Sequence, residues 1–321
     1  MRTLNFPPPV RTFATCLFIV SSWTAETTPL NAAALTPEQL EVGLEKIAPD
    51  SKGATVLLLA GSVSNKPGQH EYFAGCTLLA QWLRQNPGVT PVQAANGWPV
   101  DETLLQRART IVVYADGGQK LPFLSAERMK LMRDAMARGA GLVMLHQAVD
   151  VPAAHSAEIG DWLGGVWLPD IGSRGHWDME FPSFPKHPVT RGVQAFSAPM
   201  DGWLFNLHFR EGAVPLVAGA VPDKARTTGD ARAHAGRAEV IGWGYERKDG
   251  GRSFGFTGCD LHRNWGVESQ RKLLVNAILW ASGLEVPAEG ARADHSPGDL
   301  KRWLDSKASP EPKPQPEPKS Q

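Results

Sequence analysis

Cysteine is scarce in this chain of 321 residues, which contains only Cys16, Cys76 and Cys259. None of them lies in a CxxC or Cys/His pattern, which argues against a structural zinc site. A disulfide framework also needs more cysteines than this. Cys76 and Cys259 could pair in an oxidising compartment, but buried free thiols are the simpler expectation.

The sequence also lacks an excess of charge of one sign. It has 33 basic and 33 acidic residues and a formal net charge of zero, without a basic stripe, so we do not expect nucleic acid as a partner. Tyrosine is rare, with three residues against eleven tryptophans. Tryptophan faces stack well on sugar rings, although they also serve as ordinary core and rim material.

No apolar run is long enough for a relaxed transmembrane span. The N-terminus, MRTLNFPPPVR, carries two arginines and no acid, and an apolar run of about fourteen residues follows. We therefore interpret residues 1–34 as a signal peptide cleaved between about residues 25 and 34, and expect a periplasmic or secreted protein. The alternative is a cytosolic protein with an apolar start.

Strand and helix patterns alternate through the first half of the chain. Thr36, Pro37 and Gln39 predict a capped helix over 36–48, within an N-terminal helical segment at 35–52. Apolar runs then predict strands, and helices are expected near 70–85 and from Ser125. The predicted strands are 54–61, 89–95, 110–116 and 141–147. This alternation predicts an α/β fold with a parallel sheet and helices on both faces.

The second half of the chain is less regular. Residues 151–235 are rich in Gly, Pro and Trp and predict a loop layer with two short strands near 177–182 and 203–209. A hairpin of 237–246 and 252–258 and a helix over 268–282 complete the predicted domain, which spans 53–288. The segment 289–321 is predicted to be a disordered, Pro-rich tail. The oligomeric state stays open.

Polar residues follow four of the predicted strands, at or just beyond their carboxyl ends, where open α/β sheets bind ligands. These are His70 and Glu71; Asp116, Gly117 and Gly118; His146 and Gln147; and Cys259, Asp260, His262, Asn264 and Trp265. The loop layer adds Arg174, His176 and Trp177. Each of these residues could instead have a purely structural role, for example in a turn or at a helix N-terminus. What favours a functional site is that four strand ends bring them together.

Such imidazoles and carboxylates could do two kinds of chemistry. They could bind a divalent metal ion, for which neutral His and Asp or Glu are suitable ligands. They could instead act as general acid and base on a polyol or carbonyl substrate, because the pKa of histidine is near neutrality. The two glycines after Asp116 would let a ligand approach the backbone.

Several segments resemble the ThuA-like (trehalose-utilisation) family. The matching pieces run in order over about residues 54–287: LLLAGSVSNKPGQHEYFAGC, NGWP, VVYADGG, LVMLHQAVDVP, WLGGVW, GHWDMEF, HPVTRGVQAF, GFTGCDLHRNWG and RKLLVNAILWASGLEVP. The resemblance implies a flavodoxin-like domain similar to class I glutamine amidotransferases. In those enzymes a nucleophilic cysteine occupies the strand-to-helix elbow, where this chain has His146. Without a thiol or hydroxyl there, thioester chemistry is excluded at that position.

The resemblance also implies a role in carbohydrate metabolism, with a sugar as ligand. Family members are associated with disaccharide and glycoside catabolism, often beside dehydrogenases that make 3-keto sugars. A lyase or hydrolase acting on 3-keto glycosides or disaccharides is the first hypothesis, with metal assistance as an option. The catalytic candidates are His146, His262, His176 and Asp116. The substrate-binding candidates are His70, Glu71, Gly117, Gly118, Gln147, Trp177, Asn264 and Trp265. The alternative is a non-catalytic carbohydrate-binding or accessory protein that uses the same crevice.

The chain departs from the family pattern at several positions. The resemblance leads us to expect a histidine near Asn65, a second histidine in the stretch Cys259-Asp260, and an acidic-aromatic pair where this chain has Gly202 and Leu204. These departures reduce the number of histidines available for a metal site.

Overall fold

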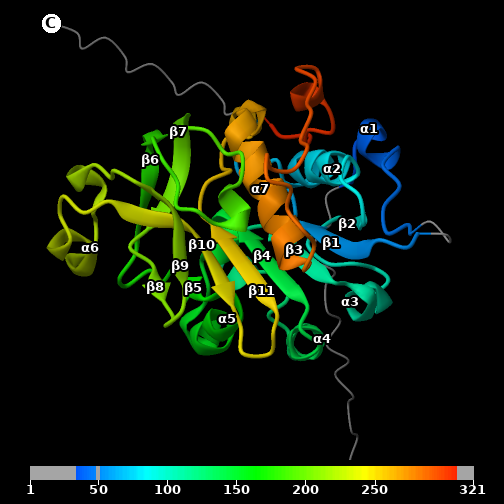
Figure 1. Cartoon of the computed structure of the whole chain (residues 1–321), viewed down its shortest axis with the longest axis horizontal. Coiled ribbons are helices and arrows are strands. Elements are labelled where there is room, and N and C mark those ends of the chain that lie inside the picture. Colours follow the sequence, from blue (N-terminus) through cyan, green and yellow to red (C-terminus); the bar gives the residue numbers. More distant parts are fainter. Residues whose placement is uncertain (1–33, 48–50, 309–321) are drawn as a thin grey trace, which may run out of the picture. The chain divides into compact units, whose positions relative to one another are not determined.

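The computed structural model describes residues 34–47 and 51–308, and a seven-stranded sheet forms its centre (Figure 1). The strand order is β2-β1-β3-β4-β11-β10-β9, in which the first five strands are parallel and β10 runs against both of its neighbours. The strands are β1 (Ala54–Ala60), β2 (Val89–Ala94), β3 (Thr110–Tyr114), β4 (Gly141–Leu145), β9 (Val214–Gly219), β10 (Glu239–Glu246) and β11 (Arg252–Phe256). The predicted α/β class is confirmed.

Helices cover both faces of the sheet, as the continuous apolar strands require. Along β1, Val56 and Leu58 pack into one core with α2 (Tyr72–Leu83) and α7 (Glu268–Ala281). The alternate residues, Leu57 and Leu59, pack into a second core on the opposite face. That core includes residues of α3 (Thr103–Arg107), α4 (Ala126–Ala137) and α5 (Ser156–Leu163). The carboxyl ends of the parallel strands lie between these two layers, at the edge where open α/β sheets carry their sites.

The predicted loop layer over 151–235 contains more regular structure than expected. A two-stranded antiparallel sheet pairs β6 (Ser173–Phe181) with β7 (Phe196–Phe205). The remaining elements are α5, β5 (Gly165–Val166), β8 (His208–Phe209), β9 and α6 (Gly229–Ala233). Most are too short for periodicity to reveal them, because a two-residue strand or a five-residue helix spans hardly more than one repeat of its pattern.

Two boundary predictions change. Helix α1 spans only Pro37–Leu40, and the predicted capping box of Thr36 and Gln39 is present. The predicted continuation to residue 48 is wrong, because Glu45 takes a left-handed backbone conformation, with φ of 55°. The prediction of disorder from residue 289 is wrong for residues 289–308, because Trp303 is buried against the domain. The predicted signal peptide and residues 309–321 lie outside the described residues, apart from Ala34.

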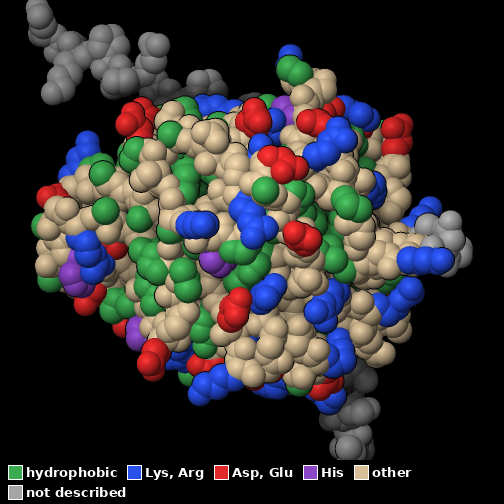
Figure 2. Space-filling model, in the orientation of Figure 1, with side chains coloured by type: hydrophobic (Ala, Val, Ile, Leu, Met, Phe, Trp, Pro, Cys, Tyr) green, Lys and Arg blue, Asp and Glu red, His purple; other side chains and the backbone are tan. Residues whose placement is uncertain are grey.

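Cys76 and Cys259 are buried and free, as expected. Among the described residues, no helix combines the length and the hydropathy needed to cross a membrane. On the face shown in Figure 2, basic and acidic side chains are interspersed rather than gathered by sign. This face offers no basic surface of the kind that binds nucleic acid.

His187 makes one pH-dependent contribution to stability outside the site. Its Nδ1 accepts a hydrogen bond from the backbone N–H of Val189 at 3.2 Å, which caps a short helix at 188–190. Burial lowers the pKa of His187, so its neutral form is favoured in the folded state. The contribution is therefore present above the unfolded-state pKa of about 6.5 and is lost as pH falls below it.

The His187→Asn variant keeps a hydrogen-bond acceptor at every pH. Between pH 7.5 and 5, we expect its free energy of unfolding to fall by up to about 1 kcal/mol less than that of the parent. Urea unfolding of both proteins at the two pH values measures this difference. Equal losses in the two proteins would contradict the assignment.

Candidate functional site

Three residues with left-handed backbone meet at the carboxyl ends of the central strands. His146 directly follows β4, with φ of 57°; His70 precedes α2, with φ of 49°; and Cys259, with φ of 80°, lies in the turn after β11. This conformation costs roughly 1–2 kcal/mol for a residue with a side chain. Strained backbone of this kind clusters at functional sites, where the rest of the fold enforces it.

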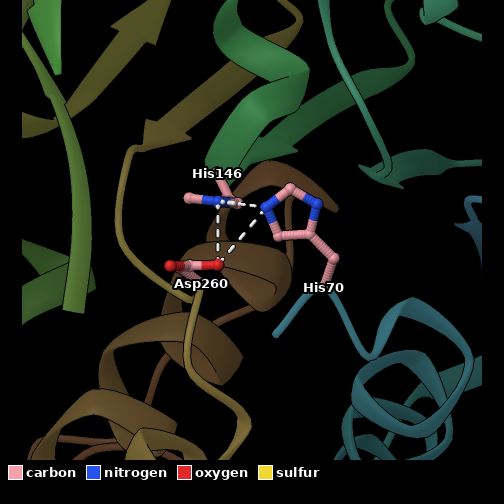
Figure 3. A group of neighbouring side chains, drawn as sticks. All are labelled: His70, His146 and Asp260. Carbon is pink, nitrogen blue, oxygen red and sulfur yellow. Dashed lines mark hydrogen bonds and ion pairs between the residues drawn. The ribbon is translucent and has the colours of Figure 1, made fainter. Parts of the chain in front are cut away.

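The side chains of His70, His146 and Asp260 converge on one point (Figure 3). The Nε2 atoms of the two histidines lie 3.1 Å apart. Asp260 Oδ1 lies 3.3 Å from His70 Nε2 and 3.6 Å from His146 Nε2. These three residues, here called the triad, arrive from three segments that are remote in sequence and adjacent only because the strands are parallel.

The outer nitrogens of the two histidines are held by acceptors. His146 Nδ1 lies 2.9 Å from the carbonyl oxygen of Thr257, so Nδ1 carries the proton and the lone pair is on Nε2. His70 Nδ1 lies 3.0 Å from Asp116 Oδ1, which also accepts hydrogen bonds from the hydroxyls of Tyr72 and Ser64. Both Nε2 atoms therefore point at the centre of the triad with fixed ring orientations.

The pKa values of the triad reflect burial and neighbouring charge. Burial lowers the pKa of His146 to about 4, and the charge of nearby His70 adds to this effect. Burial also lowers the pKa of His70, but the carboxylates of Asp116 and Asp260 outweigh it and leave the value raised. Burial raises the pKa of Asp260, and its histidine neighbours more than reverse this, so the carboxyl stays ionised. At neutral pH the triad therefore holds one anionic ligand and at least one neutral imidazole.

Asp260 links the triad to the opening of the site. Its Oδ2 lies 2.6 Å from His176 Nε2 and accepts a hydrogen bond from Gln69 Nε2 at 3.0 Å. Asp201 holds the turn itself, because its carboxylate accepts the backbone N–H groups of Cys259 and Leu261 at 3.0 and 2.9 Å. Burial raises the pKa of Asp201 to about 6.

A crevice of about 270 Å³ opens above the triad. One wall comes from the paired strands β6 and β7, which extend beyond the end of the central sheet. The residues that line it are Asn65, His70, His146, Gln147, Arg174, Gly175, His176, Gly202, Trp203, Leu204 and Asp260. The guanidinium of Arg174 lies over the ring of Trp167 and bonds Gln147 Oε1 at 3.2 Å, at the half-exposed mouth.

Four of the predicted site residues line the crevice: His70, His146, Gln147 and His176. Asp116 lies behind His70 and orients it rather than facing the opening. Gly117 and Gly118 lie close to the chain's own residue Asp150, so the backbone that approaches them belongs to the protein and not to a ligand.

The other predicted residues lie elsewhere, and the expectation that His262 shares the crevice is wrong. His262 is buried below the site, where burial lowers its pKa to about 4, and its ring nitrogens have no hydrogen-bond partner among the described residues. In an extended segment residues 260 and 262 would share a side, but His262 is the first residue of a short helical turn, His262–Gly266, so the alternation stops at Leu261. Four more predicted residues do not line the crevice. Two of them make hydrogen bonds elsewhere: Glu71 accepts the backbone N–H of Gly68, and Asn264 donates to the Pro199 carbonyl. The other two pack on aromatic rings, Trp177 on Phe205 and Trp265 on Trp82.

Sequence reasoning placed Asp260 in a crowded turn but missed its central position. The signal was present, since Asp260 lies in the turn after a predicted strand that pairs with the strand preceding His146. Gln69 and Trp203 were missed altogether. A Cβ on Gly202 would lie 2.6 Å from Asp260 Oδ2, so this chain's glycine leaves room for the aspartate where the family resemblance led us to expect an acidic residue.

The triad fits a divalent metal ion. Metal–ligand bonds of about 2.1 Å at angles of about 90–109° place neighbouring ligand atoms about 3.0–3.4 Å apart, close to the observed separations. Asp260 Oδ1 is buried and accepts no hydrogen bond of acceptable geometry from the described residues, so this oxygen lacks the partner that would offset its burial. Two imidazoles and a carboxylate on one face, with outer partners at both rings, form a metal-ligand set with positions left open toward the crevice.

Comparison with known proteins gives the same fold. A ThuA-like protein from Parabacteroides merdae superposes with a TM-score of 0.56 at 14% identity, over 78% of this chain and 99% of the other. A ThuA-like protein from Bacteroides uniformis superposes with a TM-score of 0.51 at 15% identity, over 74% and 94%. At this identity the two structures show the fold alone.

The sequence itself has no significant match among curated proteins. The model of the ThuA family, described as trehalose utilisation, matches residues 56–281. The matched segment contains all three triad residues and the central sheet except for the first two residues of β1. The chain therefore belongs to the ThuA family, which supports a carbohydrate-related role.

Proposed function

We propose that this protein binds a divalent metal ion through His70, His146 and Asp260 and catalyses elimination or hydrolysis of a 3-keto glycoside. The observation that carries the proposal is the triad itself, whose three ligand atoms surround one point with the spacing of metal ligands and include a buried carboxylate oxygen without a donor. The N-terminal sequence supports a periplasmic or secreted location.

His176 is the proton acceptor in this proposal. Its Nε2 bonds the carboxylate of Asp260, which leaves Nδ1 with a lone pair and without a hydrogen bond to any described residue. Its side chain is half exposed and lines the crevice, so a substrate can reach it. The Asp260 carboxylate orients the ring and stabilises the imidazolium that forms when the proton is taken.

The ketone at C3 makes this chemistry accessible because it acidifies the proton on C2. His176 takes that proton, the C2–H electron pair forms the C1–C2 double bond, and the C1–O bond breaks with its pair on the leaving alcohol. The leaving oxygen then takes a proton from the imidazolium, and addition of water at C1 completes a net hydrolysis. A bound divalent ion would stabilise negative charge that develops on the C3 oxygen.

The crevice suits a single sugar ring. Its volume of about 270 Å³ is at the lower end of small-molecule sites, which favours one ring inside with the second substituent outside. Gln147, Asn65 and Arg174 offer amide and guanidinium donors to sugar hydroxyls, and Trp203 contributes an aromatic wall. Among the tryptophans that the structure describes, only Trp203 lines the opening.

The test is an assay of the metal-loaded protein with 3-keto glucosides, beside the unoxidised glucosides. We expect product only from the keto substrates, a loss of activity after chelation, and a 10²–10⁴-fold lower kcat in the His176→Ala variant with its metal content unchanged. Binding of keto sugars without product would instead establish a carbohydrate-binding protein. Equal kcat in the His176→Ala variant would remove the proposed base.

A further inference from the structure

We propose that the C-terminal segment 305–307, through the buried ammonium of Lys307, positions His70 for metal binding. The inference rests on the metal-binding part of the proposed function. It concerns a second cluster of polar residues that lies behind the triad and contacts neither the crevice nor solvent. Lys307 is a positioning residue in this proposal, because it acts through the backbone of the turn that presents His70.

The turn 68–71 carries two site residues, Gln69 and His70, and Lys307 holds the main chain of both. Its Nζ donates to the carbonyl oxygen of Gln69 and, at 3.0 Å, to that of His70. The Lys307 side chain is only 2% exposed, so its charge has left water for these contacts. A buried ammonium is stable only when its donors are satisfied, which makes the turn a required partner of the segment.

Glu71 joins the same turn to the same segment. Its carboxylate lies 3.2 Å from Lys307 Nζ, accepts the backbone N–H of Asp305 at 2.9 Å, and accepts that of Gly68 at 2.8 Å. Glu71 itself is 1% exposed. The Glu71 carboxylate and the Lys307 ammonium therefore both bind the main chain of the turn, and neither side chain lines the crevice.

The turn needs such support because of its conformation. His70 has φ of 49°, which is unfavourable for a residue with a side chain, and its ring must aim Nε2 at the triad centre. On the other side, the turn is tied to the turn of Asp260, since His70 N–H donates to the Asp260 carbonyl and His262 N–H to the Gly68 carbonyl. Removal of the Lys307 contacts would leave the turn tied to the C-terminal segment only through the hydrogen bond from Asp305 N–H to Glu71.

The test compares Lys307→Met with Lys301→Met, which removes an exposed lysine of the same C-terminal region without an ion pair among the described residues. Co²⁺ is the probe, because its visible absorption reports ligand geometry as well as occupancy. We expect Lys307→Met to weaken Co²⁺ binding about 10- to 100-fold, the range typical of outer partners of metal ligands, and to alter the spectrum at saturation. Lys301→Met should match the parent.

The double variant Lys307→Met/Glu71→Gln separates positioning from folding. It removes the charge of the Glu71 carboxylate, which Lys307→Met leaves buried without its ammonium partner. The stability of the double variant should therefore be closer to that of the parent than the stability of Lys307→Met is, while its Co²⁺ binding stays weak. Restoration of parental binding in the double variant, or parental binding in Lys307→Met, would overturn the inference. Hydrogen exchange of segment 68–73 in metal-free protein gives a readout that needs no metal: we expect faster exchange in Lys307→Met and not in Lys301→Met.

The two proposals fail in different ways. A parent protein that binds no divalent ion overturns the proposed function, and the exchange measurement then decides whether Lys307 holds the turn. A parent that binds Co²⁺ while Lys307→Met shows unchanged affinity, spectrum and exchange leaves the proposed function intact and overturns the inference.

Discussion

Replacement of His146 with alanine is expected to abolish stoichiometric binding of Zn²⁺ or Co²⁺, with an affinity loss of more than about 100-fold. The imidazole supplies one of three ligand atoms, so its removal leaves only His70 and Asp260 of the triad. Isothermal titration calorimetry and metal analysis after dialysis measure the loss. Activity on a keto glycoside should fall with the metal.

The matched control is His208→Ala, because His208 is exposed on the short strand β8 and remote from the triad. It should bind metal as the parent does. If His146→Ala fails to fold, His146→Asn provides a second variant, since asparagine tolerates the left-handed conformation found at position 146. Parental affinity in either His146 variant would exclude the triad as the metal site.

Much of the fold is predictable from the first half of the chain. The strands β1, β3 and β4 are unbroken apolar runs, and such runs occur where a sheet is covered on both faces. Because those strands are parallel, polar residues at their ends had to meet at one edge, and His70 and His146 do. Topology alone therefore predicts the meeting of these two histidines.

The remainder depends on side-chain direction, which spacing does not reveal. His262 lies two residues from Asp260, which would place both on one side of an extended segment, but a short helical turn begins at His262 and its side chain points away from the crevice. Lys307 could not be predicted as part of the site region from sequence, since the Pro-rich segment beside it favours disorder and its contacts are to residues more than 200 positions away.

The Gly117→Ala substitution is expected to destabilise the protein by about 3 kcal/mol, the upper range for an overpacked core position. Gly117 has φ of −102°, which alanine also adopts, so the effect is purely steric. A Cβ there would overlap the carbonyl oxygen of Gln147 and lie 2.7 Å from Asp150 Cβ. Backbone must move, because the Gly118 N–H is bonded to the Asp150 carbonyl at 2.8 Å.

The displaced backbone is the helical turn that begins with His146, so Gly117→Ala should also weaken metal binding. The control is Gly229→Ala, whose Cβ would meet nothing within 4 Å and whose helical position suits alanine. Thermal unfolding should show Tm lowered by about 6–12 °C for Gly117→Ala and unchanged or raised for Gly229→Ala. A parental Tm together with parental Co²⁺ affinity in Gly117→Ala would show that the 147–150 turn can retreat without moving His146, and that the close contact is not what holds the metal ligand in place.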